Sequence, residues 1–274
     1  MTPSPFLKWA GGKRQLLPEL RRHLPVSFNR YYEPFIGAGA LLFDLQPGHA
    51  VINDINPELI NCYRIIRDQP AELLADLSLH LNEPDYFYAM RSLDRSTAYS
   101  ELSPVQRASR IIYLNKTCFN GLFRVNSRGE FNAPFGRYKK PAIINEAVIL
   151  AVSQYLQHSA VEILNTDFKE AVKTARRNDF VYFDPPYDPL SDTSSFTGYS
   201  RSAFGHPEQE RLRDLFEHLT AKGVKLMLSN SSTAFIRDLY RDYNIVTVQA
   251  RRNINSVGKG RAEVDEVLVL NYVP

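Results

Sequence analysis

Short apolar runs alternate with amphipathic stretches along most of the chain. Residues 31–33 and 51–52 are aromatic or β-branched and lead into polar or turn-forming residues, and comparable runs recur at residues 161–164, 180–183 and 224–228. Short apolar runs that are bounded by turn formers are typical of β-strands. Because these runs alternate with helical stretches, they predict an α/β protein with a largely parallel sheet.

The apolar positions of the longer stretches repeat at helical spacing. This spacing predicts helices at residues 57–68, 71–80, 105–116, 168–176 and 207–221. Two further apolar runs, residues 245–249 and 267–270, flank a basic loop that contains Arg251, Arg252 and residues 259–261. We expect these two runs to form a terminal antiparallel pair of strands.

The chain changes character at residues 117–140. Here Gly121, Gly129, Pro134 and Gly136 stand among aromatic and basic residues. This composition predicts turns or a hairpin instead of another helix. Because the segment follows a mainly helical region, we interpret it as a functional insert.

Composition narrows the class of protein. A chain of 274 residues with 44% hydrophobic positions buries a full core, which excludes a disordered or fibrous protein. The sequence has no long apolar run and its first 15 residues have no secretory signal, so we expect a cytoplasmic protein that does not enter a membrane. The only two cysteines, Cys62 and Cys118, do not indicate disulfides or a zinc cluster. The net charge of +3 permits nucleic-acid binding without requiring it.

A glycine turn, Gly37-Ala38-Gly39, follows the first predicted strand, and Asp54 follows the next strand. Glycines allow backbone amides to approach a ligand, and a carboxylate at the end of the next strand can accept hydrogen bonds from ribose hydroxyls. Together they suggest an adenosine-containing cofactor, although a tight turn is the alternative. The turn lacks the third glycine of a nicotinamide site. A phosphate-binding turn before Lys13 is a weaker alternative, because no Ser or Thr follows the lysine.

The apolar run at residues 180–183 leads directly into Asp184-Pro185-Pro186-Tyr187. Open α/β sheets bind ligands beyond the carboxyl ends of their strands. The exocyclic amine of a purine is a poor nucleophile, because its lone pair is delocalised, so methyl transfer requires acceptors that hold the amine. Asp184 and the Pro185 carbonyl supply two acceptors, and Tyr187 offers a ring on which a flipped base can stack. A simple proline turn is the alternative, but the glycine turn upstream favours methyl transfer.

With these motifs the chain resembles the DNA adenine methyltransferases of the GATC-modifying type (D12 class, group alpha), over nearly its whole length. The resemblance is carried by residues 6–13, 33–39, 53–56, 120–124, 129–136, 184–187 and 228–230. It implies a Rossmann-like S-adenosylmethionine-dependent methyltransferase fold with a mainly helical DNA-recognition insert. The catalytic domain would comprise residues 1–55 and 146–274, and the target-recognition domain residues 56–145.

The resemblance also implies roles for individual residues. The cofactor S-adenosyl-L-methionine would be bound by Trp9, Ala10, Gly11, Lys13, Pro34, Phe35, Gly37, Ala38, Gly39, Asp54, Ile55, Asp167, Phe168 and Asp184. The catalytic residues would be Asp184, Pro185, Pro186 and Tyr187, and no metal is implied. Duplex DNA would be contacted by Lys8, Phe119, Asn120, Leu122, Arg124, Asn132, Pro134, Arg137 and Tyr138.

Side-chain chemistry agrees with the implied DNA contacts. Arg124 suits guanine, Leu122 and Pro134 suit a thymine methyl group, and Phe119 can enter the gap that a flipped base leaves. Phe119 departs from relatives that often carry tyrosine here, which removes a hydroxyl and keeps the ring. The alternatives are core positions for Phe119 and Leu122 and a solvated ion pair for Arg124. Lys139, Lys140 and the basic loop would suit phosphate contacts, although a solvated loop is the commoner meaning of a short charge run.

Three other functions stay open from the sequence. One is a methyltransferase for a longer GAT-containing site or for a cytosine amine. Another is a catalytically silent DNA-binding protein, against which the intact Gly37, Gly39, Asp54 and Asp184 argue. The third is a small-molecule or RNA methyltransferase, for which the basic and aromatic insert would be superfluous. We expect a monomer on a palindromic site, and a functional pairing with a restriction endonuclease is consistent with the sequence.

Overall fold

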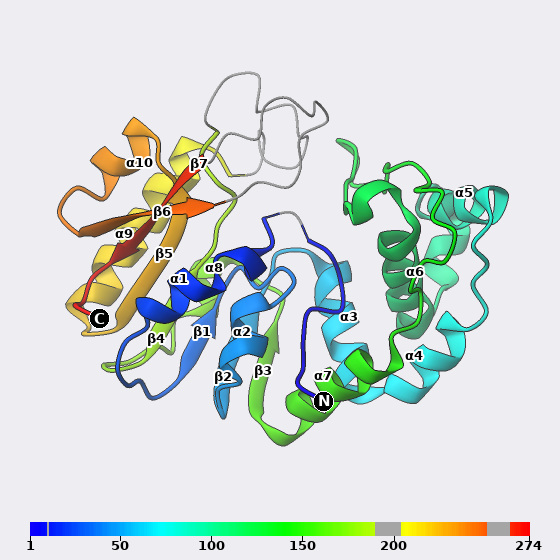
Figure 1. Cartoon of the computed structure of the whole chain (residues 1–274), viewed down its shortest axis with the longest axis horizontal. Coiled ribbons are helices and arrows are strands. Elements are labelled where there is room, and N and C mark those ends of the chain that lie inside the picture. Colours follow the sequence, from blue (N-terminus) through cyan, green and yellow to red (C-terminus); the bar gives the residue numbers. More distant parts are fainter. Residues whose placement is uncertain (10, 190–203, 251–263) are drawn as a thin grey trace. The chain divides into compact units, whose positions relative to one another are not determined.

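The computed structural model describes residues 1–9, 11–189, 204–250 and 264–274. The chain divides into two compact units, each of which combines segments that are distant in sequence (Figure 1). Unit 1 comprises Met1–Gly12, Ile36–Gly48 and Asn53–Thr166, and unit 2 comprises Lys13–Phe35, His49–Ile52 and Asp167–Pro274. Unit 1 is mainly helical, whereas unit 2 contains most of the strands.

Seven strands form a sheet in the order β3-β2-β1-β4-β5-β7-β6. They are β1 (Tyr31–Glu33), β2 (His49–Asn53), β3 (Ala160–Leu164), β4 (Phe180–Phe183), β5 (Lys225–Ser231), β6 (Asn244–Ala250) and β7 (Val264–Leu270). β1 pairs in parallel with β2 and β4, and β4 pairs in parallel with β5. β7 is antiparallel to β5 and β6, which confirms the predicted terminal pair and the mixed α/β sheet.

β4 ends at Phe183, whereas its neighbour β5 continues to Ser231. All four residues of β4 are buried and apolar, as expected of a parallel strand that is covered on both faces. The register aligns Phe183 with Leu228. The next residues of the two strands, Asp184 and Ser229, therefore emerge beside each other.

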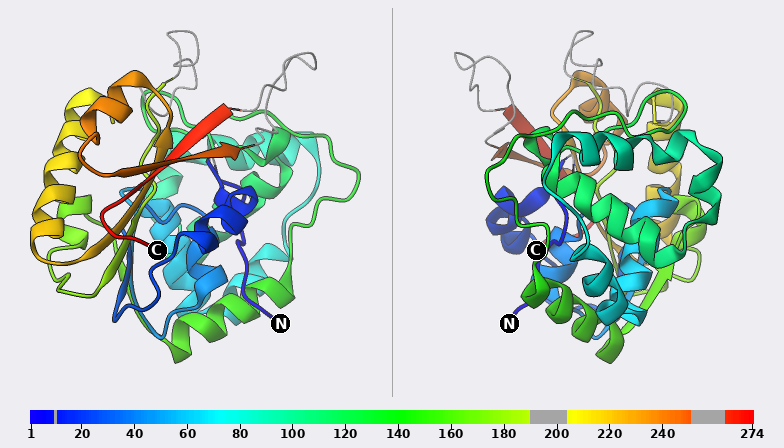
Figure 2. Two further views of the ribbon diagram at one scale, coloured as in Figure 1. Left: turned by 60° about the vertical axis from the view of Figure 1, so that its left-hand side comes forward. Right: turned by 90° about the vertical axis from the view of Figure 1, so that its right-hand side faces the viewer.

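The helices of unit 2 are α1 (Leu17–Arg22), α8 (Phe168–Ala171), α9 (His206–Ala221) and α10 (Ala234–Leu239), with a 3-10 turn η1 (Lys13–Gln15). In the left view of Figure 2, α9 (yellow) runs alongside the strands of this unit. Its buried Phe216 ring lies 6.3 Å from the ring of Phe183, so the apolar side of α9 covers β4.

The prediction of a helix over residues 168–176 is wrong at its end, because α8 stops at Ala171. The Asp179 side chain is buried and accepts hydrogen bonds from the backbone amides of Arg176 at 2.8 Å and Arg30 at 3.1 Å. These bonds hold the chain before β4 in a turn. A local side-chain acceptor thus replaces the last helical turns that the apolar spacing predicts.

The helices of unit 1 are α2 (Ala40–Leu45), α3 (Pro57–Asp68), α4 (Pro70–Leu77), α5 (Pro84–Ser92), α6 (Pro104–Thr117) and α7 (Glu146–His158). Its 3-10 turns are η2 (Leu93–Arg95), η3 (Thr97–Glu101) and η4 (Phe119–Gly121). α3 has the predicted bounds, and the Asn56 side chain caps it by accepting from two backbone amides. Ser103 and Gln106 form a capping box at the start of α6. α4 ends at Leu77, three residues before His80, where the sequence predicts the end of this helix.

Residues 118–140 form the turn-rich segment that the sequence predicts. Two isolated antiparallel bridges, Cys118 with Phe135 and Val125 with Phe131, close it, and Gly129 turns the chain with a φ of 80°. Cys62 and Cys118 are free and buried. Within the described ranges, no helix is long and apolar enough to cross a membrane.

Candidate functional site

The glycine turn that follows β1 lies in unit 1 and is held from two sides. The Gly37 amide donates to Asp54 Oδ2 at 3.1 Å, and the Gly37 carbonyl accepts from the Tyr63 hydroxyl at 3.0 Å. Gly37 and Gly39 have φ values of 48° and 70°, which favour glycine. A Cβ atom on Gly37 would lie 3.1 Å from Trp9 Cδ1, and one on Gly39 would lie 2.7 Å from Tyr63 Oη. The turn therefore requires both glycines.

Asp54 directly follows β2 and is partly exposed beside this turn. Its Oδ1 atom accepts from the Asn56 amide at 3.0 Å, while Oδ2 accepts from Gly37. Burial raises the pKa of Asp54 to about 6, and backbone hydrogen bonds from Asn56, Gly37 and Ile55 oppose that rise. A carboxylate offers about four lone-pair positions, so acceptor capacity remains for the two hydroxyls of a ribose. These features fit the adenosine part of S-adenosyl-L-methionine.

Unit 2 contributes an aromatic group. The ring of Phe35 lies 5.4 Å from Phe168, and both rings pack against Phe204. The Arg211 guanidinium lies 4.3 Å from the centre of the Phe168 ring and forms an ion pair with Asp167. The group combines flat apolar surfaces with a carboxylate, which is a chemistry suited to a purine ring. Arg211 was not predicted as part of a site.

Asp184 is the centre of a polar network in unit 2, where β4 ends beside β5. Its Oδ1 atom lies 2.8 Å from Lys13 Nζ and accepts a hydrogen bond from the Ser229 hydroxyl at 2.8 Å. Burial raises the pKa of Asp184, while the charge of Lys13 and the hydrogen bonds from Lys13 and Ser229 lower it. The side chain keeps 17% of its surface exposed, so a substrate can reach it.

Pro185, Pro186 and Tyr187 follow Asp184 and are held by other side chains of unit 2. The Gln209 amide donates to the Pro186 carbonyl at 2.9 Å, and the Tyr187 hydroxyl donates to Glu266 Oε2 at 2.9 Å. Among the described residues, no donor contacts the Pro185 carbonyl. The sequence predicts that this carbonyl and the Asp184 carboxylate accept hydrogen bonds from the amine. Lys13 Nζ lies 4.4 Å from the centre of the Tyr187 ring, so one ring face carries a cation.

Several residues of this network have no role assigned from the sequence, although the motif 228–230 contains Ser229 and Asn230. Ser229 holds Asp184, and Asn230 accepts from the Asp188 amide at 3.0 Å and donates to Gln209 at 3.1 Å. Glu266 holds Tyr187 from β7. The signal for the first two is the polar pair Ser229 and Asn230 inside an apolar strand, where buried hydroxyl and amide groups need partners.

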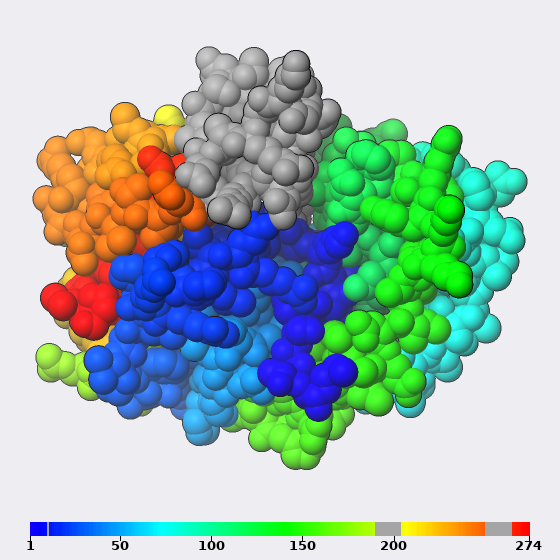
Figure 3. All heavy atoms as spheres, viewed as in Figure 1, coloured from blue at the N-terminus to red at the C-terminus, as the bar shows by residue number. Residues whose placement is uncertain are grey.

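The residues predicted to contact DNA all belong to unit 1, and most lie in the segment 118–140. In Figure 3 the green side chains of this part of the chain reach the molecular surface. The Phe119 side chain is 56% exposed, and its amide donates to the Pro134 carbonyl at 2.8 Å. A core position for Phe119 is therefore wrong. Leu122 is half-buried and Pro134 is exposed.

Arg124 and Lys8 are exposed and are positioned by amides. Arg124 donates from Nε to Asn132 Oδ1 at 2.7 Å, so its partner is a neutral side chain and the ion-pair alternative is wrong within the described residues. The backbone of Lys8 is fixed by Asn115, which accepts from the Lys8 amide at 2.9 Å and donates to the Lys8 carbonyl at 2.8 Å. Asn120 has a φ of 58° in the turn η4.

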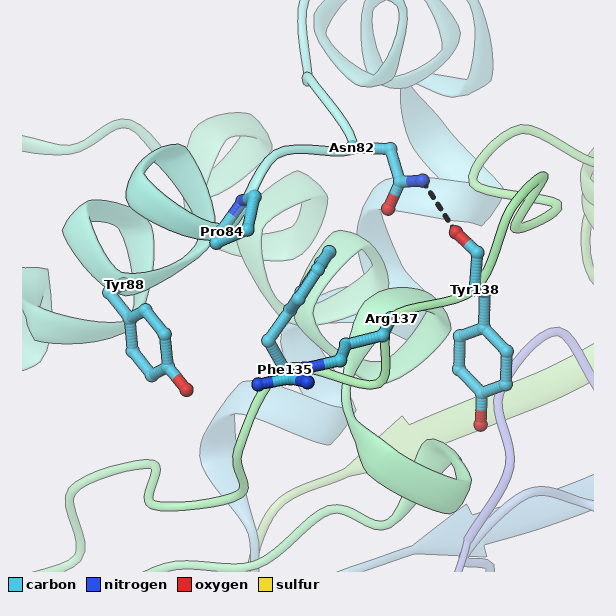
Figure 4. Close-up of a pocket in the computed structure, with 6 residues that line it drawn as sticks. All are labelled: Asn82, Pro84, Tyr88, Phe135, Arg137 and Tyr138. Atoms are coloured by element: carbon cyan, nitrogen blue, oxygen red, sulfur yellow. Dashed lines mark hydrogen bonds between the residues drawn. The ribbon is translucent and has the colours of Figure 1, made fainter.

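A groove of about 380 Å³ lies in unit 1, and three of its lining residues belong to the segment 118–140 (Figure 4). It is lined by Asn82, Pro84, Tyr88, Phe135, Arg137 and Tyr138. Asn82 Nδ2 donates to the Tyr138 carbonyl at 2.8 Å, which fixes the backbone of a residue that the sequence assigns to DNA binding. Arg137 lines the same groove with a φ of 53°.

Within each unit, the structure brings part of the predicted cofactor set together. Unit 1 contains Trp9, Gly11, Gly37, Ala38, Gly39, Asp54 and Ile55, and unit 2 contains Lys13, Pro34, Phe35, Asp167, Phe168 and Asp184. In unit 1, Gly37 lies beside the Trp9 ring and donates a hydrogen bond to Asp54. Ala10, Arg251, Arg252 and residues 259–261 lie outside the described residues.

Comparison with known proteins assigns the family. A family model described as D12 class N6 adenine-specific DNA methyltransferase matches residues 9–254. The type II methyltransferase M1.LlaDCHI of Lactococcus lactis subsp. cremoris is 48% identical, with 98% of this chain and 95% of the relative covered. The type II methyltransferase M.MjaIII of Methanocaldococcus jannaschii is 41% identical, with 99% and 100% covered. The DNA adenine methylase of Escherichia coli is 36% identical, with 98% and 95% covered.

A mixed α/β sheet with a glycine turn after one strand and Asp-Pro-Pro-Tyr after another has the parts of an amine methyltransferase. The chain belongs to the D12 class N6 adenine-specific DNA methyltransferases. It is an adenine-specific DNA methyltransferase that uses S-adenosyl-L-methionine. Membership of this family excludes the cytosine, small-molecule, RNA and silent-binder alternatives.

Proposed function

We propose that this enzyme methylates the N6 amine of adenine in duplex GATC, after the adenine has swung out of the helix. The observation that carries the proposal is the segment 118–140, which presents Phe119, Arg124 and Pro134 at the surface of unit 1. An arginine fork suits guanine, proline suits the thymine methyl, and an aromatic ring suits the gap left by the flipped base. The motifs shared with GATC-modifying enzymes support the same target.

In the proposed mechanism, S-adenosyl-L-methionine supplies an electrophilic methyl group on its sulfonium. Asp184 and the Pro185 carbonyl accept hydrogen bonds from the two N–H groups of adenine and hold the amine in line with that methyl group. The burial that raises the pKa of Asp184 also makes its carboxylate a stronger acceptor, and the charge of Lys13 lowers that pKa and so favours the ionised form. Tyr187 stacks on the flipped base, and Glu266 fixes the ring through the hydroxyl.

For the cofactor we propose two sets of contacts. Asp54 accepts hydrogen bonds from the ribose hydroxyls. The turn from Gly37 to Gly39 brings the backbone close to the ligand, because glycines have no Cβ atom to block the approach. The aromatic group of Phe35 and Phe168 packs on the adenine ring of the cofactor. The other residues that we propose to bind the cofactor are Trp9, Ala10, Gly11, Lys13, Pro34, Ala38, Ile55, Asp167 and Asp184.

For the DNA we propose that residues 56–145 are the target-recognition domain and that the remainder of the chain is the catalytic domain. The DNA set also includes Lys8, Asn120, Leu122, Asn132, Arg137 and Tyr138. We propose a monomer that visits the two strands of the palindrome in turn. Sedimentation equilibrium of the enzyme with and without a duplex tests that state, and a stable dimer on DNA would contradict it.

A pairing with a restriction endonuclease is a second proposal about biological role. It is favoured by the names of two relatives, both of which are type II methyltransferases. The test is an extract of the source organism, which should cleave unmethylated plasmid and spare plasmid that this enzyme has methylated. An extract that cleaves neither plasmid would indicate a solitary enzyme.

The direct test of the target uses purified enzyme and duplexes with GATC or with a single changed base pair at each position. We expect a changed pair at the G, T or C position to reduce kcat/KM on the target adenine by about 5- to 150-fold relative to GATC. A changed pair at the A position removes that adenine and should abolish its methylation. Equal methylation of duplexes that differ outside the GAT would instead show that only GAT is read. Dependence on bases that flank GATC would show a longer site.

A further inference from the structure

The guanidinium of Arg124 is already fixed by a single residue on the opposite side of the turn. Its Nε atom donates to Asn132 Oδ1 at 2.7 Å, and its Nη2 atom donates to the Asn132 carbonyl at 3.1 Å. These bonds use one edge of the planar group. A guanidinium has five N–H groups, so the end that carries Nη1 and the second Nη2 hydrogen keeps donors for a base.

The geometry points to Asn132 as the positioning residue that aims Arg124 at guanine. Because the Arg Nε atom can only donate, the Asn132 side chain presents its oxygen to the arginine. Guanine presents two acceptors, O6 and N7, which match two parallel N–H groups of an arginine fork. An arginine held in this orientation does not have to be ordered when DNA binds. This inference rests on the proposed function, in which Arg124 reads a guanine.

Asn132 is itself held by the residues on either side of it. Phe131 and Ala133 are buried, whereas the Asn132 side chain faces the other way, as alternation in an extended segment requires. The Asn132 amide donates to the Arg124 carbonyl at 2.8 Å. Arg91 Nη1 donates to the Ala133 carbonyl at 3.2 Å. The backbone around Asn132 is therefore tied on both sides.

The hydrogen bonds of the Phe131 backbone connect this segment to the helical part of unit 1. The Phe131 amide donates to Asp94 Oδ2 at 2.7 Å, and its carbonyl accepts from Arg95 Nη2 at 2.7 Å. The same Asp94 oxygen lies 3.0 Å from Arg110 Nη2, and the Arg110 side chain on α6 is 1% exposed. The buried pair of Asp94 and Arg110 therefore fixes the backbone next to Asn132, because charged donors and acceptors make strong hydrogen bonds.

The alternative role for Asn132 is a direct hydrogen bond to a phosphate. Phosphate oxygens only accept, so that role would depend on the Nδ2 donors of the amide and not on Oδ1. The two roles make opposite demands on a carboxylate at this position. Asn132→Asp keeps the acceptor for Arg124 and adds charge attraction, whereas it would repel a phosphate.

The experiment measures kcat/KM on GATC and on two duplexes, in each of which one of the two guanines of the site is replaced, for wild type, Asn132→Asp, Asn132→Leu, Arg124→Ala and the double variant Arg124→Ala/Asn132→Leu. Asn132→Leu keeps the volume of the side chain and removes the acceptor. We expect Asn132→Leu to lower the discrimination ratio by about 5- to 150-fold, Asn132→Asp to keep it, and the double variant to match Arg124→Ala. Arg128→Ala on the same hairpin is the matched control and should leave the ratio unchanged.

A second readout needs neither DNA nor turnover. In a ¹H–¹⁵N spectrum of the free enzyme, the Nε–H signal of Arg124 should move in Asn132→Leu and stay close to wild type in Asn132→Asp. An unmoved signal in Asn132→Leu, or equal losses on all three duplexes, would overturn the role of Asn132. Unchanged discrimination in Arg124→Ala would instead refute the proposed reading of guanine, which distinguishes the two failures.

Discussion

Lys13 Nζ lies 2.8 Å from Asp184 Oδ1, and both side chains are largely buried. The pair joins the segments 6–13 and 184–187, two of the motifs that carry the family resemblance. Burial raises the pKa of Asp184, and the cation beside it is the largest opposing influence. Because only the ionised carboxylate accepts a hydrogen bond with both oxygens, Lys13 sets the pH range in which Asp184 can hold the amine.

Replacement of Lys13 by methionine should therefore shift the pH dependence of the reaction. Loss of the positive charge raises the pKa of Asp184 further, so the acid limb of the kcat profile should move to higher pH. The profile is measured at saturating S-adenosylmethionine, which separates this effect from weaker cofactor binding. Lys13→Arg keeps the charge and should retain the wild-type limb. A methionine variant with the wild-type limb would show that Lys13 does not control Asp184.

Cofactor binding should weaken as the pH falls through about 6, which is the raised pKa of Asp54. Above that pH the carboxylate accepts hydrogen bonds from two ribose hydroxyls, and below it the protonated carboxyl group can accept fewer hydrogen bonds. Calorimetric titration of S-adenosylmethionine from neutral to acidic pH measures the effect. Asp54→Asn should bind more weakly at neutral pH and lack this pH dependence. A wild-type Kd that stays constant across pH 6 would exclude Asp54 as the ribose acceptor.

Gly39→Ala should destabilise the fold by more than ~1 kcal/mol. Gly39 has a φ of 70°, and an added Cβ atom would lie 2.7 Å from Tyr63 Oη. Gly48→Ala is the matched control, because a Cβ there meets nothing within 4 Å and its φ lies outside the left-handed region. Urea unfolding followed by circular dichroism compares the two free energies of unfolding. Equal free energies for both variants would mean that the turn is not constrained as described.

Phe119→Ala should impair base flipping while leaving the fold intact. The side chain is 56% exposed, so we expect a stability change within ~0.5 kcal/mol. Without the ring, the flipped state should be populated roughly tenfold less, which is ~1.4 kcal/mol of the few kcal/mol that flipping costs. The fluorescence of 2-aminopurine at the target position reports this change. Phe119→Tyr restores the ring and should flip normally, and an alanine variant that flips normally would rule out the wedge.

The sequence predicts the parts of this enzyme that depend on local pattern. All seven strands, α3, α6 and α9 follow from apolar spacing and caps, because the buried faces repeat with the period of the element. α5 is not predicted, because Phe87 is its only buried residue and a single buried position gives no helical periodicity. α7 and the short α10 are not predicted either. The end of α8 depends on Asp179, which acts through its side chain.

The candidate site is predicted where a motif is contiguous and missed where it depends on strand register. Asp184 and Tyr187 stand out as a tetrapeptide after an apolar run. Ser229 becomes a partner of Asp184 only because β4 and β5 are aligned with Phe183 opposite Leu228. Such alignments are set by packing, so no local pattern reveals them.

The most direct test is long-read sequencing of plasmid DNA from a methylation-deficient host that expresses either the wild-type chain or Asp184→Ala. Modified bases are scored in every sequence context, and soluble expression of both chains is confirmed. We predict N6-methyladenine on both strands of GATC and nowhere else for the wild type, and none for Asp184→Ala. Methylation at other sites would contradict the proposed target, and methylation that persists in Asp184→Ala would contradict the central role of Asp184.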